Sequence, residues 1–205
     1  MKSLEGENTA LPDQDSLGIV FITLGIDGSL LDESVVKLKQ ELDQELEYAY
    51  EEGFDNCSIR RIKKVYFSKI DALLDASSTG PQWLKKYDLV KMVIAQLAEL
   101  ENQQLQTVCY TVMPNHLHLV LEPNNIYGND LVSKFEQFRE NSAQLANDLL
   151  KHDQNFWNKD YHLHYIHDQK ELINIISYIL ENPVKAGLVD YWQDWPWTYC
   201  NPDYI

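Results

Sequence analysis

The stretch Met113-Pro114-Asn115-His116-Leu117-His118-Leu119-Val120-Leu121 decides the fold of this chain. A Pro-Asn turn leads directly into alternating residues, and this alternation is typical of a β-strand. On a strand, His116 and His118 project from one face, while Leu117 and Leu119 point the other way into a core. Two imidazoles side by side on a rigid strand supply half of a metal site. We therefore predict a core strand over 116–122 that carries two metal-ligating histidines.

Taken alone, the His-Leu-His pattern is a weak motif, because two surface histidines with structural hydrogen bonds would give the same pattern. The chain contains a second copy, His162-Leu163-His164, in a polar and aromatic neighbourhood with His167 close by. Only the first copy leads into an apolar strand. We interpret His162 as an ordinary surface histidine or as a residue that supports a ligand without contacting the metal.

Farther along the chain, Tyr178 and Asn182 stand four residues apart in a helical pattern, so they share one helix face. Each residue also has a simpler explanation, because Tyr178 suits an apolar helix and Asn182 precedes Pro183, a position that favours helix ends. As a ligand, the amide oxygen would join two imidazole nitrogens, a set that suits Mg²⁺ or Mn²⁺ and is less specific for zinc. The four side chains together suggest metal-assisted attack by a tyrosine on a phosphodiester.

Length and composition indicate a soluble globular protein. The 205 residues, 44% apolar and 24% charged, fit one domain or one domain with a large insertion. No apolar run is long enough to span a bilayer, and the polar, acidic start over 1–15 is unlike a signal peptide. The three cysteines, Cys57, Cys109 and Cys200, are widely spaced and suggest reduced thiols rather than a disulfide framework. We expect a cytoplasmic protein that has no contact with a membrane.

The charge argues against binding nucleic acid through phosphates alone. The chain has 17 Lys+Arg and 32 Asp+Glu, a net charge of −15, whereas proteins that hold DNA through phosphates are usually basic. The segment 106–205 has 6 basic and 13 acidic residues, a net of −7. Acids dominate 32–55, and a local basic run follows: Arg60, Arg61, Lys63, Lys64 and Lys69. Any nucleic acid must therefore bind through local patches, aromatic stacking or a metal.

The pattern of apolar residues predicts strands interleaved with helices. Strands are expected over 17–24, 106–112, 116–122 and 161–166, and helices over 32–52, 62–74, 83–100, 129–150 and 169–181. Asp168 is the expected N-cap of the last helix, Asn182-Pro183 its end, and 192–202 a segment that wraps the domain. This order predicts an α+β fold with a ferredoxin-like antiparallel sheet and helices on one face. We expect one domain over 1–205, with a flexible tail over 1–16 and a helical insertion over 55–85.

Two of these motifs closely resemble a known family when they are taken together. Met113-Pro114-Asn115-His116-Leu117-His118 and Tyr178-Ile179-Leu180-Glu181-Asn182-Pro183-Val184-Lys185-Ala186-Gly187-Leu188-Val189 resemble the REP-associated tyrosine transposases. These belong to the HUH superfamily of single-strand DNA nucleases and are relatives of small insertion-sequence transposases. The resemblance runs from about Gly18 to Trp197 and includes three further motifs: Thr79-Gly80-Pro81-Gln82-Trp83-Leu84, Phe156-Trp157 and Asp194-Trp195-Pro196-Trp197.

The resemblance implies a ferredoxin-like sheet that carries the histidines, with the tyrosine helix beside it. It implies that His116, His118 and Asn182 hold a divalent metal, Mg²⁺ or Mn²⁺, and that Tyr178 is the nucleophile. Tyr178 would attack a phosphodiester, form a 5′-phosphotyrosine and free a 3′-hydroxyl, which allows strand transfer without ATP. The family acts on single-stranded DNA with hairpin-forming repeats, and its members work as monomers or homodimers.

Three basic residues are candidates for DNA contacts: Arg139, Lys159 and Lys185. Two alternatives stay open at this stage. In the first, the same fold binds hairpin DNA or RNA but no longer cuts it, which the acidic charge favours. In the second, a metallohydrolase uses water to cleave a small phosphodiester, and no protein-linked DNA forms.

Overall fold

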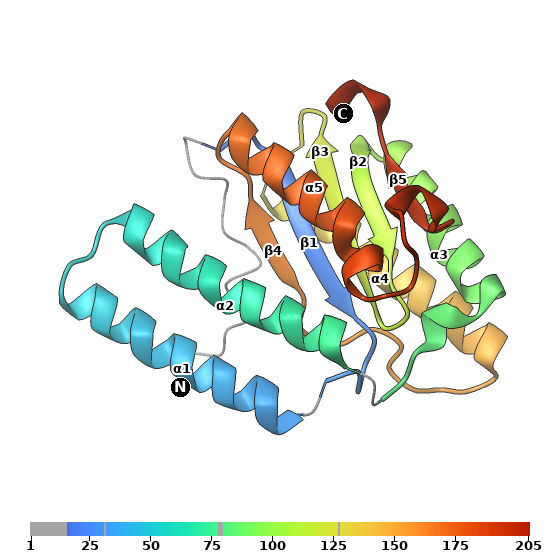
Figure 1. Ribbon diagram of the computed structural model, residues 1–205, viewed down its shortest axis with the longest axis horizontal. Coiled ribbons are helices and arrows are strands. Elements are labelled where there is room, and N and C mark those ends of the chain that lie inside the picture. The colour runs from blue at the N-terminus through green and yellow to red at the C-terminus, as the bar shows by residue number, and fades with distance from the viewer. Residues whose placement is uncertain (1–15, 31, 78–79, 127) are drawn as a thin grey trace. The chain divides into compact units, whose positions relative to one another are not determined.

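The computed structural model describes residues 16–30, 32–77, 80–126 and 128–205 (Figure 1). The chain separates into two compact units. We name the unit formed by the segment up to Asp27 and by Gln82–Ile205 the sheet unit, and the unit formed by Gly28–Pro81 the helical unit. The helical unit starts well before the predicted insertion at 55–85. The predicted tail over 1–16 lies almost wholly outside the described residues.

In the described part of the sheet unit, five strands form one antiparallel sheet in the order β4-β1-β3-β2-β5. The strands are β1 (Val20–Gly25), β2 (Leu105–Val112), β3 (His116–Pro123), β4 (His162–Tyr165) and β5 (Thr198–Cys200). β2 and β3 form the expected hairpin around Pro114-Asn115, in which Val112 lies opposite Leu117. The strand that carries the paired histidines is therefore the middle strand of the sheet. The predicted α+β class with an antiparallel sheet is confirmed.

Strand register decides which side chains share a face of this sheet. Between β1 and β3, Ile22 lies opposite Leu119, and Thr23 lies opposite His118. Side chains that lie opposite each other point the same way, so the leucines and the histidines occupy opposite faces. On the leucine face, the core includes side chains from α3 (Tyr87–Glu101) and α4 (Asn129–Leu150): Leu89, Val93, Leu97, Phe135 and Phe138.

Helix α5 (Gln169–Lys185) covers the histidine face instead. Its Tyr178 ring lies 5.5 Å from the His118 ring, centroid to centroid. Figure 1 shows α5 crossing in front of the sheet, with α4 behind it. The expectation of helices on one face was wrong. Every residue of β1 is buried, including Phe21 on the histidine face, and a sheet whose central strands are apolar on both sides needs a cover on both.

The end of α5 also differs from the prediction. Asn182-Pro183 does not end the helix, which continues to Lys185. Leu188 N donates to Pro183 O at 3.0 Å, and Gly187 N donates to Val184 O at 2.9 Å. With Gly187 at φ +67°, these two bonds form a Schellman motif, so the glycine ends the helix. The predicted N-cap is confirmed, since Asp168 accepts from Glu171 N at 2.8 Å.

The C-terminal segment supplies a strand that the sequence did not reveal. We expected 192–202 to wrap the domain, but β5 pairs with the outer edge of β2. Val112 N donates to Trp197 O at 3.0 Å, and Asn201 N donates to Val108 O at 2.8 Å. Short 3₁₀ turns flank it at Trp192–Asp194 and Pro202–Tyr204. A strand of only three residues between aromatic residues and proline is too short to show a period of two.

Among its described residues, the helical unit contains two helices, α1 (Asp32–Glu51) and α2 (Asn56–Ala76). Asp55 caps α2 by accepting from Ser58 N at 2.8 Å. The basic run of the sequence lies on α2, and one of its members, Lys69, pairs with Glu41 of the acidic α1 at 3.5 Å. Part of the positive charge on α2 is thus matched within its own unit.

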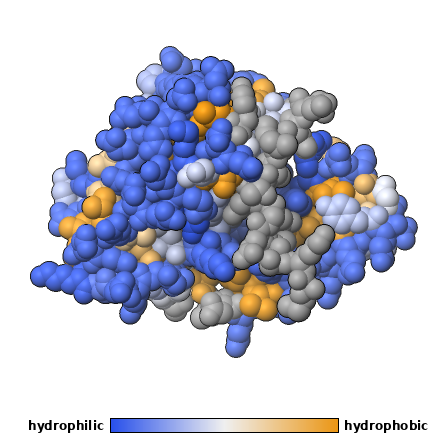
Figure 2. Space-filling model, turned by 180° about the vertical axis from the view of Figure 1, so that it is seen from behind, coloured by the Kyte–Doolittle hydropathy of each residue, from blue (hydrophilic) through white to orange (hydrophobic). Residues whose placement is uncertain are grey.

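Hydrophilic residues dominate the side of the molecule seen in Figure 2, which faces away from the viewer in Figure 1. This is the side of α3 and α4, whose inner faces pack on the leucine face of the sheet. No helix among the described residues is both long and apolar enough to cross a membrane.

Candidate metal and nucleophile site

The two histidines of β3 point their Nε2 atoms at each other. His116 Nε2 and His118 Nε2 are 3.1 Å apart, and both side chains are fully buried. Two imidazole nitrogens that bind one metal at about 2.0–2.2 Å are separated by about this distance. The period of two along β3 brings the rings to one face, as predicted.

The other nitrogen of each ring is held by a neighbouring side chain. His116 Nδ1 lies 2.8 Å from Asn115 Oδ1, and His118 Nδ1 lies 2.8 Å from Thr23 Oγ1. An amide oxygen only accepts hydrogen bonds, so His116 carries its proton on Nδ1 and presents a lone pair on Nε2. Thr23 can donate or accept, and it leaves both tautomers open to His118. Such outer hydrogen bonds orient the rings of histidines that bind metals.

Burial keeps both rings neutral. It lowers the pKa of His116 to about 3. Burial, with a smaller contribution from the neighbouring His116, also sets the pKa of His118 well below its ordinary value. A neutral imidazole is the form that binds metals, so these rings are ready to accept one at neutral pH.

Tyr178 lies against this pair. Its ring meets the His118 ring at 5.5 Å and an angle of 67°, and it meets the Phe21 ring at 6.4 Å. The Lys185 ammonium lies over the tyrosine ring, 5.0 Å from its centroid. The helix period thus brings an aromatic nucleophile candidate and a cation to the histidine face of the sheet.

Asn182 follows Tyr178 by one turn and is fully buried in the last turns of α5. Neither its Oδ1 nor its Nδ2 has a hydrogen-bond partner among the described residues. A buried amide without partners costs about 1–3 kcal/mol, and an absent ligand is one recognised reason for such a group. Two neutral imidazole nitrogens and an amide oxygen are donors of the kind that a divalent ion accepts.

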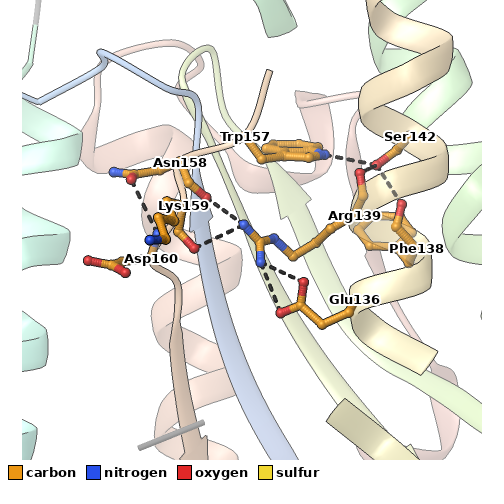
Figure 3. Close-up of polar contacts among 8 residues, drawn as sticks. All are labelled: Glu136, Phe138, Arg139, Ser142, Trp157, Asn158, Lys159 and Asp160. Carbon is orange, nitrogen blue, oxygen red and sulfur yellow. Dashed lines mark hydrogen bonds and ion pairs between the residues drawn. The ribbon is translucent and has the colours of Figure 1, made fainter. Parts of the chain in front are cut away.

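Arg139 and Lys159, two of the predicted DNA contacts, meet elsewhere in the sheet unit (Figure 3). Arg139 Nη1 binds both carboxylate oxygens of Glu136 at 2.8 and 2.9 Å. Its Nη2 donates to the carbonyl oxygens of Asn158 at 2.6 Å and Lys159 at 3.1 Å. The guanidinium also lies 4.8 Å from the centre of the Tyr161 ring. This arginine therefore fixes the segment that leads into β4, while the Lys159 residue is exposed.

A second set of hydrogen bonds beside Arg139 holds the same segment. Trp157 Nε1 donates to Ser142 Oγ at 2.8 Å, and Ser142 Oγ in turn donates to Phe138 O at 2.7 Å (Figure 3). Phe156 and Trp157 are buried. Burial of these two aromatic side chains gives the Phe-Trp motif a packing role that anchors the 156–161 segment on α4.

The second His-Leu-His copy has a different setting. His164 Nε2 lies 3.1 Å from Glu171 Oε1 at the start of α5, and Glu171 Oε2 accepts from His167 N at 3.0 Å. Around this copy, the described residues contain no cluster of three side chains placed to share a metal. The arrangement is a contact at the start of α5, and the interpretation of His162 stays a prediction.

Sequence reasoning missed Thr23 and Asn115. Asn115 directly precedes His116, and a polar residue next to a candidate ligand is the only local signal for it. Thr23 is 95 residues away from His118 and lies opposite it only through the β1–β3 register. No local pattern could have identified this threonine.

Sheet and site together define a class of protein: an antiparallel α+β sheet with paired histidines on its middle strand and a tyrosine helix packed against them. No protein-family model matches the chain. A protein from Haemophilus influenzae (strain ATCC 51907 / DSM 11121 / KW20 / Rd), named as a candidate REP-associated tyrosine transposase, is 29% identical over 111 residues. The match covers 50% of this chain and 63% of that protein, so the chain spans less than two thirds of this curated relative.

A solved structure supports the same fold. The REP-associated tyrosine transposase bound to a REP hairpin aligns with a TM-score of 0.55 at 16% identity, covering 89% of this chain and 76% of the other. Together with the curated relative, this match supports the resemblance of the chain to the REP-associated tyrosine transposases.

Proposed function

We propose that this chain is a metal-dependent, single-strand DNA endonuclease and strand transferase that acts on hairpin-forming repeat DNA. The observation that carries the proposal is the contact between the Tyr178 ring and the His118 ring, 5.5 Å apart, beside two Nε2 atoms that converge to 3.1 Å. The names of the curated relative and of the solved structure support a transposase-type reaction and a hairpin substrate.

His116, His118 and Asn182 would hold Mg²⁺ or Mn²⁺. The bound ion would polarise the scissile phosphate and neutralise charge that develops on the leaving oxygen. Asn115 and Thr23 would keep both imidazoles oriented for this task. The amide of Asn182, which has no hydrogen-bond partner within the described part of the chain, supports its part in the set.

Tyr178 would supply the nucleophile. Its phenolic oxygen forms a bond to phosphorus, the bond between phosphorus and the 3′ oxygen breaks, and the phenolic proton ends on the freed 3′-hydroxyl. The product is a 5′-phosphotyrosine that a second 3′-hydroxyl can attack in the reverse sense. The contacts of the tyrosine ring with the Phe21 and His118 rings support this role, because they would hold the nucleophile in position before the substrate arrives.

Lys185 would contact the DNA backbone close to the reacting phosphate. Its ammonium lies 5.0 Å from the centre of the Tyr178 ring on an exposed helix end, where a phosphate oxygen can approach both groups. Lys159 stays a predicted DNA contact, and Arg139 would support it by holding the backbone of the 158–159 segment. A cytoplasmic location, and action as a monomer or a homodimer, belong to the same proposal.

The test uses a labelled single-stranded hairpin with Mn²⁺ or Mg²⁺ and a denaturing gel for a protein–DNA adduct. We expect an adduct with the native chain and none with Tyr178→Phe, which keeps the ring contacts. Tyr191→Phe, at a side chain that is 70% exposed, is the matched control and should keep the adduct. A Tyr178→Phe variant that still forms the adduct, or cleavage without any adduct, would refute the nucleophile.

The competing candidate is a protein of the same fold that binds hairpin DNA or RNA without cutting it. The net charge of −15 favours this candidate. An acidic protein binds the phosphate backbone of a nucleic acid weakly, which suits a protein that recognises a hairpin by its shape. Under this candidate, the native chain and Tyr178→Phe shift the hairpin equally in a native gel, and neither forms an adduct.

A further inference from the structure

Two of the three cysteines meet across a pair of strands that are distant in sequence. Cys109 of β2 lies opposite Cys200 of β5, and Cys57 belongs to the helical unit. The pairing depends wholly on β5, the strand that the sequence did not reveal. Both cysteines have free thiols.

Antiparallel strands have hydrogen-bonded and non-hydrogen-bonded residue pairs, and the Cα atoms of the second kind lie closer together. Cys109 and Cys200 form a pair of the second kind. Val112 N donates to Trp197 O, and Asn201 N donates to Val108 O, so the hydrogen-bonded pairs are 112–197 and 108–201. Pairs alternate along an antiparallel ladder, which leaves Cys109 and Cys200 as a non-hydrogen-bonded pair with Cα atoms typically about 4.5 Å apart. That separation lies within the range of about 4.4–6.8 Å that a disulfide spans.

The side chains also point the same way. Thr111 lies opposite His118, so Thr111 and Cys109, two residues apart, both face the histidine side of the sheet. On β5, Thr198 and Cys200 share that face, and the Thr111 and Thr198 hydroxyls are 2.8 Å apart. The two thiols therefore lie next to each other on the histidine face of the sheet, beside the Thr111 and Thr198 hydroxyls, which are already in contact.

The two thiols have unequal surroundings. A hydrogen bond with Cys200, and then burial, raise the pKa of Cys109, whereas the hydrogen bond with Cys109 lowers the pKa of Cys200. Cys109 is buried and Cys200 is partly exposed. Cys200 is thus the thiol that a dissolved oxidant reaches first, and Cys109 is a protected partner beside it.

From this geometry we propose that Cys109 and Cys200 form a reversible intramolecular disulfide that ties β5 to the sheet when the chain meets a small disulfide oxidant. The Cys200 thiolate attacks oxidised glutathione, forming a Cys200–glutathione disulfide and releasing one glutathione thiolate. The Cys109 sulfur then attacks Cys200 sulfur, and the second glutathione leaves with the Cys109 proton. Two protein thiols are oxidised and one molecule of glutathione disulfide is reduced to two thiols.

The consequence is a covalent clamp at the edge of the sheet. Without it, the three residues of β5 are held by a short ladder, the Thr111–Thr198 contact and packing of neighbouring aromatic rings such as Tyr110 on Tyr199. The bond closes a loop from Cys109 to Cys200 and restricts the unfolded chain strongly, because the stabilisation grows with loop length. Such bonds are transient and regulatory in reducing compartments.

The test uses full-length chain in a Cys57→Ser background, so that the exposed third thiol cannot react. After equilibration with oxidised glutathione under native conditions, we expect a mass lower by two hydrogens, a linked Cys109–Cys200 peptide and no retained glutathione. The melting temperature should rise by several degrees and return after dithiothreitol. Adding Cys200→Ser should abolish both changes. Two free thiols at equilibrium, or a lasting glutathione adduct on Cys200, would overturn the proposal; neither outcome bears on the nuclease function.

Discussion

Arg139→Ala separates a structural role of this arginine from a role in DNA binding. The side chain is only 13% exposed, and it holds the Glu136 carboxylate and the carbonyl oxygens of Asn158 and Lys159 (Figure 3). Alanine leaves all three acceptors without this donor. A hydrogen bond to a charged group contributes about 1.5–3 kcal/mol, and the partly exposed Glu136 regains some of this from water. We expect a loss of about 3 kcal/mol in the free energy of unfolding.

The measurement is urea unfolding of the native chain, Arg139→Ala and Arg139→Lys. Lysine keeps the positive charge, but its single nitrogen cannot bind the Glu136 carboxylate and also reach both carbonyls, as the two nitrogens of the guanidinium do. Lysine should therefore recover less than half of the loss. Gln137→Ala, at an exposed position of the same helix, is the matched control and should change the stability by less than about 0.5 kcal/mol.

An arginine that mainly contacts phosphate would give the opposite pattern. Arg139→Ala would then unfold like the native chain and bind a hairpin more weakly, while Arg139→Lys would retain most of the affinity. Stability within about 0.5 kcal/mol of the native chain would therefore refute the structural reasoning. A double-mutant cycle with Glu136→Gln measures how much of the effect belongs to the ion pair itself.

Three further predictions concern the site, the helix end and alkaline stability. Thr23→Val should weaken Mn²⁺ binding, measured by calorimetry, about 10–100-fold, because His118 Nδ1 loses its partner. Thr23→Ser should restore the affinity. Equal Mn²⁺ affinities of the native chain and Thr23→Val would exclude the orienting role. Gly187→Ala should cost about 1 kcal/mol in urea unfolding, since a side chain at φ +67° is strained, whereas Pro183→Ala should leave the helix end in place. Burial, with a smaller contribution from the nearby Tyr199, raises the pKa of Tyr110 to about 12. The neutral phenol therefore contributes its full stabilisation of the fold below pH 10, and this contribution disappears as the pH rises through 12. Tyr110→Phe should therefore reduce the loss of stability between pH 10 and 12; an unchanged pH profile would show that this phenol stays solvated.

Local patterns predicted the parts of the structure that depend on neighbours in sequence. The alternation in 116–121 is enough to place His116 and His118 on one face and the leucines on the other, because a strand repeats every two residues. The spacing of Tyr178 and Asn182 likewise fixes a shared helix face. That α5 then lies over the histidines follows from a tertiary need, the cover for Phe21 and its neighbours, which no single segment encodes.

Register between distant strands explains what sequence reasoning missed. Thr23 meets His118, and Cys109 meets Cys200, only because β1 and β5 pair at particular offsets. A shift of one residue would turn each side chain to the other face. The prediction of where α5 ends was wrong for a different reason. Asn182-Pro183 was expected to end the helix, but Gly187, farther along the chain, has the left-handed backbone that ends it.

The acidity of the chain becomes easier to reconcile with a DNA substrate once the charges are placed. Arg139 is paired with Glu136, and Lys69 of the helical unit with Glu41, so neither is a strong source of attraction for phosphates. Lys185, by contrast, lies 5.0 Å from the centre of the Tyr178 ring, where a phosphate must arrive for the proposed reaction. A site of this kind would place a cation and a bound metal at the reacting phosphate and leave recognition of the hairpin to its shape and unpaired bases. The acidic sequence excludes a basic surface that attracts DNA broadly. The proposed reaction does not need one, because positive charge is required only at the reacting phosphate.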